Sequence, residues 1–261
     1  MGDWDPARYL RFSEERGRPC RDLLARLAEL TPSSVLDVGC GPGNSTAQLA
    51  AAFPAARVCG IDASEEMLKK ARAACPGVSF VRAAVPGGLS ALGGQPFDLI
   101  FSNACLQWIP EPEAVLSALA GRLSPEGTLA VQIPLVQQAA FYRVLRALTA
   151  PDGAWARLSA VYPFHVREPE WYYDCLCRRF SCVQLWTTVY YHTVDSVGGV
   201  LDWYRGSGLR PYLDALDEAE REPFLSALQA ALSADYPVRE NGAVLLPMPR
   251  LFFIAEGLRA K

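Results

Sequence analysis

The sequence predicts an α/β fold in which a doubly wound parallel sheet carries helices on both faces. Short apolar, β-branched segments alternate with helical segments through the first half of the chain. A glycine-rich turn follows the first of these strands, and an acidic residue ends the second. The hydrophobic content is 51% and the charged content 20%, which is typical of a folded globular chain.

The individual elements follow from the spacing of apolar residues. Two amphipathic segments, 6–15 and 19–29, are predicted to form helices ahead of the sheet. Further helices are expected at 44–52, from Ser64 onward, and at 111–122. Seven segments have the composition of strands: 35–38, 57–61, 78–81, 97–101, 127–133, 182–192 and a stretch within 243–255.

Two further segments, about 135–177 and 196–241, are helical in pattern and rich in aromatic residues. We expect them to form a helical cap on the sheet. A chain of 261 residues fits one large domain, so residues 1–261 are predicted to form a single domain with this cap and the N-terminal helices 6–29.

The loop after the first strand indicates a ligand. Gly39, Cys40, Gly41, Pro42 and Gly43 form a turn with little side-chain bulk, and Asn44 opens a helix. Such a turn brings backbone N–H groups close to a nucleotide-like ligand. The dinucleotide fingerprint requires a third glycine at position 44, and the P-loop requires a Lys-Ser/Thr pair; neither is present.

Two acids accompany this loop. Asp37 precedes the first glycine by two residues, which suits a cationic ligand without phosphate. Asp62 ends the second strand, 19 residues after Gly43, where a carboxylate can bind both ribose hydroxyls. The alternative for Asp62 is a helix-capping role beside Ser64. The loop and the acids together resemble the cofactor site of class I S-adenosylmethionine-dependent methyltransferases, which have a Rossmann-like seven-stranded sheet.

Composition limits the partners. The net charge of −3 argues against nucleic acid. No signal peptide and no apolar run of membrane-spanning length is visible, so we expect a cytoplasmic protein without membrane contact. The eight cysteines lack zinc-site spacing, and no metal is predicted. Five arginines near the N-terminus favour either an anionic small ligand or a solvated helix face: Arg8, Arg11, Arg16, Arg18 and Arg21.

The segment after the fourth strand, 102–108, bears on the methyl acceptor. It lacks the Asn/Asp-Pro-Pro-aromatic pattern with which some methyltransferases grip a planar amine. Cys105 lacks the preceding proline of a cytosine-methylating nucleophile, and we interpret it as buried packing. A small-molecule acceptor is therefore favoured over a nucleic-acid base.

Nearly the whole chain resembles the trans-aconitate 2-methyltransferases, which esterify a carboxylate of a small tricarboxylic acid. The resemblance includes the cap, which unrelated methyltransferases seldom share. It rests on Asp3-Trp-Asp-Pro, Tyr9-Leu-Arg-Phe12, Gly39-Cys-Gly-Pro-Gly-Asn-Ser-Thr46, Gly60-Ile-Asp62, Asp98-Leu-Ile-Phe-Ser-Asn-Ala-Cys-Leu-Gln-Trp108, Tyr190-Tyr-His192, Asp202-Trp-Tyr-Arg-Gly-Ser-Gly-Leu-Arg-Pro211, Glu240-Asn-Gly242 and Pro249-Arg-Leu-Phe252.

The resemblance implies S-adenosyl-L-methionine as cofactor and a small carboxylic acid as substrate. No catalytic acid or base is required, because a carboxylate is already anionic at neutral pH. The implied cofactor-binding residues are Tyr9, Arg16, Asp37, Gly39, Cys40, Gly41, Asn44, Asp62, Ala63, Met67, Ala84, Asn103, Gln107 and Trp108. Candidates for binding the acid are Arg205, Arg210 and Arg250, helped by Tyr190, Tyr191 and His192, whereas Trp203 and Tyr204 are expected in the cap core.

Two departures from the family pattern keep alternatives open. Ala84 stands where an acid often meets the adenine amino group, and the loop after Pro134 is apolar and amide-bearing over 135–140. The alternatives are another O, N or C acceptor, or a regulatory protein that binds S-adenosylmethionine without turnover. The sequence does not fix the oligomeric state and is compatible with a monomer.

Overall fold

The computed structural model describes residues 13–161 and 163–259. Seven strands form one sheet in the order β3-β2-β1-β4-β5-β7-β6. The pairs β2–β3, β1–β2, β1–β4 and β4–β5 are parallel, and β7 is antiparallel to β5. The strands are β1 (Ser34–Val38), β2 (Arg57–Asp62), β3 (Ser79–Arg82), β4 (Phe97–Asn103), β5 (Leu123–Pro134), β6 (Phe180–Val194) and β7 (Val244–Leu258).

The helices complete the predicted α/β architecture, which is confirmed. The α-helices are α2 (Ser13–Ala25), α3 (Asn44–Ala52), α4 (Glu65–Ala74), α5 (Pro112–Ala120), α6 (Ala140–Leu148), α7 (Pro169–Cys177), α8 (Val197–Arg205), α9 (Arg210–Asp214) and α10 (Glu218–Leu232). Short 3₁₀ helices are η1 (Gly87–Leu92), η2 (Leu106–Trp108), η3 (Val136–Gln138) and η4 (Ala156–Val161).

One predicted boundary at the N-terminus is wrong. Most of the segment 6–15 lies outside the described residues, but the expected start of a second helix at Pro19 does not occur. Instead α2 begins at Ser13 and runs through Pro19. A proline inside a helix leaves the carbonyl four residues earlier without its N–H partner. That residue is Glu15, which is exposed, so water can satisfy its carbonyl group.

The chain divides into two compact units. Of the described residues, we call 17–134, 165–188 and 250–259 the sheet unit, and 13–16, 135–161, 163–164 and 189–249 the cap unit. Helix α7 belongs to the sheet unit, although the sequence groups it with the cap segment 135–177. The assignment of the whole chain to a single domain stays a prediction.

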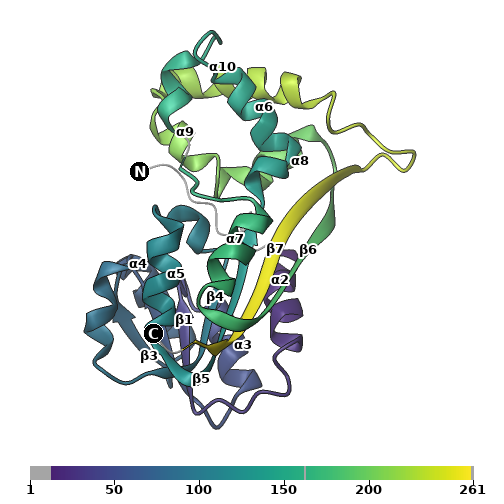
Figure 1. The fold of residues 1–261 in the computed structure, drawn as a ribbon. Helices are drawn as coiled ribbons and strands as arrows, with labels where there is room; N and C mark the ends of the chain where they lie inside the picture. Colours follow the sequence, from purple (N-terminus) through teal and green to yellow (C-terminus); the bar gives the residue numbers. More distant parts are fainter. Residues whose placement is uncertain (1–12, 162, 260–261) are drawn as a thin grey trace. The chain divides into compact units, whose positions relative to one another are not determined.

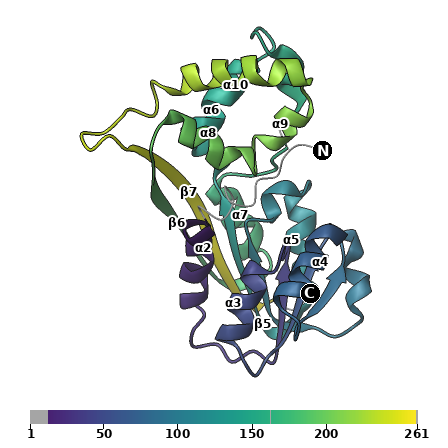
Figure 2. The same ribbon diagram turned by 180° about the vertical axis from the view of Figure 1, so that it is seen from behind.

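Helices cover both faces of the sheet unit (Figure 1 and Figure 2). Successive residues of a strand point to opposite faces. Phe252 of β7 stacks on Trp186 of β6 at 5.2 Å, and Arg26, just beyond α2, lies 4.2 Å over the same indole ring. Phe253 stacks on Tyr172 of α7 at 5.8 Å. These contacts place α2 and α7 on opposite faces, and Figures 1 and 2 show α3 on the side of α2 and α5 on the side of α7.

The strands at the centre of the sheet unit are buried on both faces. The residues of β1 are all buried, and Leu99, Ile100 and Phe101 of β4 have no exposed surface. Continuous apolar runs of this kind are typical of parallel strands covered by helices. The hydrophobic pattern that predicts the strands is thus also the core that holds them.

Aromatic contacts hold the cap unit together. The ring of Phe141 in α6 stacks on Tyr204 of α8 with centroids 3.7 Å apart. The Phe141 N–H donates a hydrogen bond to the Tyr236 hydroxyl at 3.0 Å. The Tyr204 hydroxyl in turn contacts the Met248 sulfur at 3.2 Å. Trp203 and Tyr204 are each 2% exposed, which places both in the core of the cap unit, as expected.

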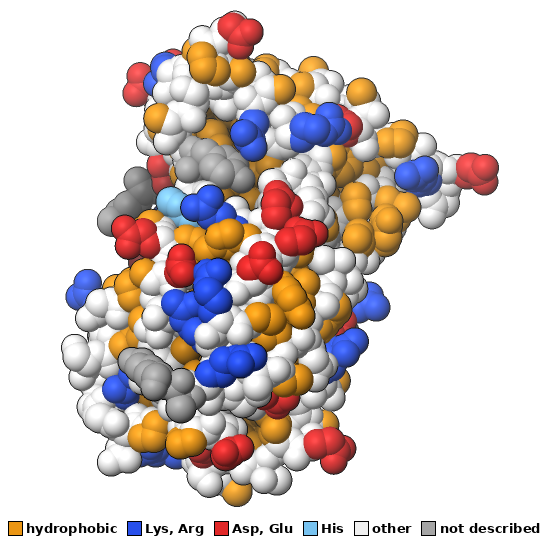
Figure 3. Space-filling view, in the orientation of Figure 1, with side chains coloured by type: hydrophobic (Ala, Val, Ile, Leu, Met, Phe, Trp, Pro, Cys, Tyr) orange, Lys and Arg blue, Asp and Glu red, His pale blue; other side chains and the backbone are white. Residues whose placement is uncertain are grey.

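The surface of the sheet unit mixes both signs of charge. Figure 3 shows Lys and Arg side chains lying among Asp and Glu side chains on the side of α5 and α7. One such pair joins the two helices, since Arg178 lies 3.0 Å from Glu113. Within the described residues, none of the helices has the length and apolar character needed to cross a membrane.

Candidate functional site

The glycine loop is tightly packed at two of its glycines and open at the third. Gly39, Gly41 and Gly43 have φ angles of 70°, 53° and 95°. A Cβ on Gly39 would lie 2.1 Å from the Cys105 sulfur, and one on Gly43 would lie 3.2 Å from the Ala71 Cα. A Cβ on Gly41 would meet nothing within 4 Å. The open side of the loop is therefore at Gly41, where a ligand can approach the backbone.

Asp62 connects this loop to the end of β2. Its carboxylate accepts hydrogen bonds from the Gly41 N–H at 3.0 Å and from the Ser64 N–H at 2.8 Å. An ionised carboxylate has about four acceptor positions, so about two remain for hydroxyl groups of a ligand. The capping role belongs to Ser64, whose hydroxyl accepts from the Met67 N–H at 3.3 Å.

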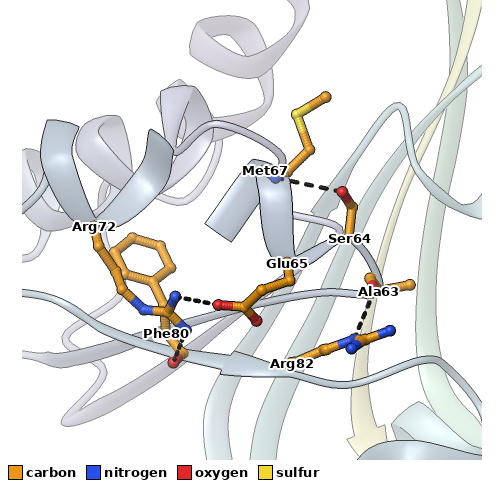
Figure 4. Close-up of polar contacts among 7 residues, drawn as sticks. All are labelled: Ala63, Ser64, Glu65, Met67, Arg72, Phe80 and Arg82. Carbon is orange, nitrogen blue, oxygen red and sulfur yellow. Dashed lines mark hydrogen bonds and ion pairs between the residues drawn. The ribbon is translucent and has the colours of Figure 1, made fainter. Parts of the chain in front are cut away.

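Polar contacts fix the segment that leads from Ala63 into α4 (Figure 4). The Arg82 side chain of β3 donates to the Ala63 carbonyl at 3.1 Å. Glu65 and Arg72 form an ion pair at 2.7 Å, and the Met67 side chain points away from it in Figure 4. Ala63 is exposed and Met67 half-buried, so both are accessible to a ligand next to Asp62.

Asp37 reaches the loop from beneath. Its side chain has no exposed surface, and Oδ2 accepts hydrogen bonds from the Ser45 hydroxyl at 2.7 Å and the Thr46 hydroxyl at 2.6 Å. Oδ1 has no hydrogen-bond partner among the described residues. Burial raises the pKa of Asp37 to about 6, against the effect of the two hydroxyls and with a smaller contribution from the charge of Asp62. A positive charge at the loop would favour its ionised form.

Two loop residues differ in exposure. Cys40 is 3% exposed and belongs to a buried cluster with Leu68 and Phe80. Asn44 is exposed as the first residue of α3.

Cys105 is half-buried against Gly39, and desolvation raises the pKa of its thiol to about 12. This thiol is neutral at pH 7, which agrees with a packing role.

The turn after β4 holds a residue in an unusual conformation. Ala104 has a φ of 55°, which is uncommon for a residue with a side chain. Its N–H donates to the Gln132 carbonyl at 3.0 Å, and its carbonyl accepts from the Gln107 amide at 2.6 Å. Such strain persists where the surrounding structure holds it and is frequent at ligand sites. Trp108 follows at the end of η2 and is 39% exposed.

Several buried amide oxygens near this turn lack partners. Asn103 Oδ1 and Gln107 Oε1 have no hydrogen-bond partner in the described part of the chain. Gln132 of β5, which is not among the residues predicted from the sequence, has no exposed surface, and neither its Oε1 nor its Nε2 has a described partner. The available signal was a long polar side chain inside an otherwise apolar buried strand.

Ala84 lies in the stretch between β3 and η1. It is exposed, and its carbonyl accepts a hydrogen bond from the Gly88 N–H at 2.6 Å. Its methyl group provides no acceptor for an adenine amino group.

The predicted cofactor residue Tyr9 lies outside the described residues, as does the side chain of Arg16.

Of the three β6 residues predicted to help bind an acid, two are buried and one is exposed. Tyr190 and His192 are 2% and 7% exposed, and the His192 ring stacks on Trp203 at 4.5 Å. They lie in the cap core because alternate residues of β6 share one face. Tyr191 between them is 64% exposed.

The predicted arginines differ in their surroundings. Arg205 lies 3.6 Å from Asp202, and Arg210 lies 3.6 Å from Asp214, each one turn away on its own helix. Arg250 belongs to the sheet unit, where β7 places it opposite Pro134 at the end of β5. The structure thus divides these three arginines between the two units.

The cap unit contains a cavity of about 640 Å³ that the sequence did not predict. Arg143 and Arg146 line it, together with Gln137 from the altered loop, and among the residues that the structure describes none in the lining is acidic. Arg143 also forms an ion pair with Asp235. The polar lining consists of Gln137, Tyr142, Arg143, Arg146, Thr149, Ser159 and Tyr212, a set suited to a small anion.

The sheet order, the glycine loop and the acid ending β2 define a class I methyltransferase. A methyltransferase domain model matches residues 35–127. Trans-aconitate 2-methyltransferases from Azoarcus sp. (strain BH72) and Methylobacterium nodulans are each 43% identical to this chain, covering 98% and 99% of it and 99% and 100% of their own lengths. The chain belongs to the trans-aconitate 2-methyltransferase family.

More distant structures share the fold. The YcgJ protein of Bacillus subtilis superposes with a TM-score of 0.59 at 16% identity, covering 94% of this chain and 99% of its own. A phosphoethanolamine N-methyltransferase of Haemonchus contortus, solved with S-adenosylhomocysteine, superposes with a TM-score of 0.58 at 16% identity, covering 93% of this chain and 53% of its own. At this identity the likeness extends to the fold alone.

Proposed function

We propose that this protein transfers a methyl group from S-adenosylmethionine to a carboxylate of trans-aconitate or a closely similar polycarboxylic acid. The observation that carries the cofactor assignment is the pair formed by Asp62 and Gly41. Asp62 keeps acceptor positions for ribose hydroxyls, and the open side of Gly41 gives a ligand access to the backbone. The acceptor is inferred from the names of the full-length relatives.

The remaining cofactor residues have roles that fit this ligand. S-adenosylmethionine supplies a methyl group on a cationic sulfonium. Asp37 would place a buried negative charge beneath the loop, and the exposed Ala63 and half-buried Met67 would border the adenosine beside Asp62. Asn103 would offer its unpartnered amide oxygen to an N–H donor of the ligand. Gln107 and Trp108 would border the same end of the site.

The reaction requires that the carboxylate oxygen, the methyl carbon and the sulfur are aligned, and no acid or base takes part. A carboxylate oxygen forms a bond to the methyl carbon as the carbon–sulfur bond breaks, and the sulfur leaves as a neutral thioether. No proton moves. The residues of this chain therefore act by holding the acid in line and by excluding water from the carboxylate. Arginine guanidinium groups are suited to hold the carboxylates that do not react.

Two sets of arginines are candidates for that task. The first is Arg205, Arg210 and Arg250, with Tyr190 and His192 packed in the cap core. The second is Arg143 and Arg146 in the cap cavity, whose volume is ample for a small polycarboxylate. Under this proposal residues 1–261 act as one methyltransferase domain, and the cap segments 135–177 and 196–241 determine which acid is accepted.

The test is a methyl-transfer assay with the full chain, saturating S-adenosylmethionine and a panel of acids. The proposal predicts a monomethyl ester from trans-aconitate or a related polycarboxylate. Ester formed only from monocarboxylates would contradict an arginine-lined acceptor site. Cofactor binding without ester from any acid would favour a regulatory S-adenosylmethionine-binding protein, and methyl transfer to an amine or alcohol would favour a different acceptor.

A further inference from the structure

We infer that Gln132 is a positioning residue for the acceptor: its amide N–H donates a hydrogen bond to the carboxylate that is methylated. The inference rests on the proposed function and names a residue that nothing else in the site explains. Its basis is the state of the Gln132 side chain, which has no exposed surface and no hydrogen-bond partner for either amide atom among the described residues.

An unsatisfied buried amide is costly. Most buried polar groups in native proteins are paired, because leaving a donor or acceptor without a partner loses its hydration and gains nothing. A leucine or methionine would fill the same position in an apolar strand without that cost. The neighbours of Gln132 along β5, Val131 and Ile133, are apolar and fully buried. A glutamine among them is best explained by a ligand that satisfies its amide.

The register of the sheet shows which side chains lie beside the Gln132 amide. Gln132 is paired with Asn103 of β4 and with Phe252 of β7, so the three side chains share one face. This is the face of α3, because Asp37 lies on it and bonds to Ser45 and Thr46. Asn103 also has an unpartnered amide oxygen. Asn103 is half-buried as a residue, and its Oδ1 and both amide atoms of Gln132 are covered by protein.

The position along the sheet favours the acceptor over the cofactor. The glycine loop follows β1, and β5 is two strands away in the order β1-β4-β5. At about 4.8 Å between neighbouring strands, Gln132 lies roughly 10 Å from β1. Apart from Tyr9 and Arg16, the proposed cofactor residues belong to β1, β2, β4 and the segments that follow β1 to β4. An amide on β5 therefore lies beyond them, on the side where an acceptor is presented.

An amide suits the reacting carboxylate for a chemical reason. The N–H of a neutral amide can orient one carboxylate oxygen while the other attacks the methyl carbon. An arginine in the same place would hold the carboxylate more strongly and would reduce its nucleophilicity. Gln132 takes no proton and forms no covalent bond, so the balance of the reaction is unchanged: one C–O bond forms and one C–S bond breaks.

The test compares Gln132→Met with the wild type, because methionine keeps the length of the side chain and removes the amide. We expect kcat/KM for the acid to fall about ten- to a hundredfold, mainly through KM. The Kd of S-adenosylhomocysteine should change less than twofold. The melting temperature should stay equal or rise, because the unsatisfied amide is gone. Gln132→Glu, which sets two carboxylates against each other, should lower kcat/KM at least as much.

Thr128→Val is the matched control on the same strand and the same face. Thr128 lies toward the opposite end of β5, and its hydroxyl bonds to Glu256 at 3.3 Å. This variant should lower the melting temperature and leave kcat/KM unchanged. A Gln132→Met enzyme with kcat/KM within threefold of the wild type would overturn the inference and leave the proposed function standing. Equal losses of S-adenosylhomocysteine affinity and of kcat/KM would assign the amide to the cofactor and also overturn it. A wild-type protein that methylates no acid would overturn the proposed function, and this inference with it.

Discussion

The carboxylate of Asp62 accepts a hydrogen bond from the backbone N–H of Gly41 over 3.0 Å, which joins the end of β2 to the open side of the glycine loop. The same carboxylate accepts from the Ser64 N–H at the start of α4. Asp62 therefore holds the two backbone segments that would border the cofactor. A ligand bound to it would contact a preformed site.

Replacing Asp62 by alanine should weaken cofactor binding. We expect a loss of about 2 kcal/mol or more, from charge-assisted hydrogen bonds to ribose. Calorimetric titration with S-adenosylhomocysteine measures it. Asp98→Ala is the matched control, since Asp98 accepts hydrogen bonds from Ser33, Ser34 and Ser124 near the opposite end of β4. That variant should lose stability and keep its affinity. Unchanged affinity in Asp62→Ala would remove Asp62 from the site.

The buried Asp37 predicts a pH effect on stability. Its pKa in the folded protein is about 6, above the ordinary value of 3.8. The folded state therefore binds this proton more tightly than the unfolded state does. The contribution of Asp37 to stability is full below pH 3.8 and is lost as the pH rises through about 6. Asp37→Asn should remove this part of the pH dependence in urea unfolding measured between pH 4 and pH 7.

The same residue should favour the cationic cofactor over its neutral product. Ionised Asp37 attracts a sulfonium, so the ratio of S-adenosylmethionine to S-adenosylhomocysteine affinity should increase from pH 5 to pH 7. Taking the ratio cancels effects common to both ligands. In Asp37→Asn the ratio should be flat across this range. A ratio independent of pH in the wild type would show that Asp37 does not sense the charge of the ligand.

Two glycine substitutions should separate packing from ligand access. Gly39→Ala places a Cβ 2.1 Å from the Cys105 sulfur, so we expect a lower melting temperature. Gly41→Ala meets no protein atom within 4 Å, and its cost in stability should be about 1 kcal/mol, from the positive φ. Gly41→Ala should nevertheless weaken S-adenosylhomocysteine binding at least tenfold, because its Cβ faces the open side. Full affinity in Gly41→Ala would place the ligand elsewhere.

Among the arginines, Arg250 should contribute most to acid binding in the sheet unit. It lies opposite Pro134, two residues beyond Gln132 along β5. Arg250→Gln should lower kcat/KM for the acid about ten- to a hundredfold and leave cofactor affinity unchanged. Arg178→Gln, which removes an exposed ion pair with Glu113, serves as the control and should change neither. A lower melting temperature in Arg250→Gln with unchanged kinetics would make Arg250 a structural residue.

Much of the fold was predictable because its signals are local. The apolar run of β1, the glycines after it and the capping Ser64 each specify conformation within a few residues, and the predicted helix at 44–52 matches α3 (Asn44–Ala52). The prediction that a helix starts at Pro19 was wrong. Whether a proline stands at the start of a helix or inside it depends on where the helix begins, which is Ser13 here.

The polar interior was less predictable. The sequence predicts that Asp37 contacts a ligand. Only the three-dimensional structure shows that its carboxylate accepts hydrogen bonds from Ser45 and Thr46 beneath the loop. Gln132 and Asn103 are 29 positions apart in sequence, and the β4–β5 register brings them together. The cavity lined by Arg143 and Arg146 depends in the same way on packing within the cap unit. Local patterns do not encode such pairings.

The most direct test of the account is mass-spectrometric analysis of trans-aconitate incubated with the wild-type protein and methyl-labelled S-adenosylmethionine. We expect one labelled methyl ester per acid, formed in step with S-adenosylhomocysteine, and loss of the product in Asp62→Ala. The altered loop at 135–140 predicts that a related polycarboxylate can compete with trans-aconitate as the better substrate. S-adenosylhomocysteine affinity in the micromolar range together with no labelled ester from any polycarboxylate would contradict the account.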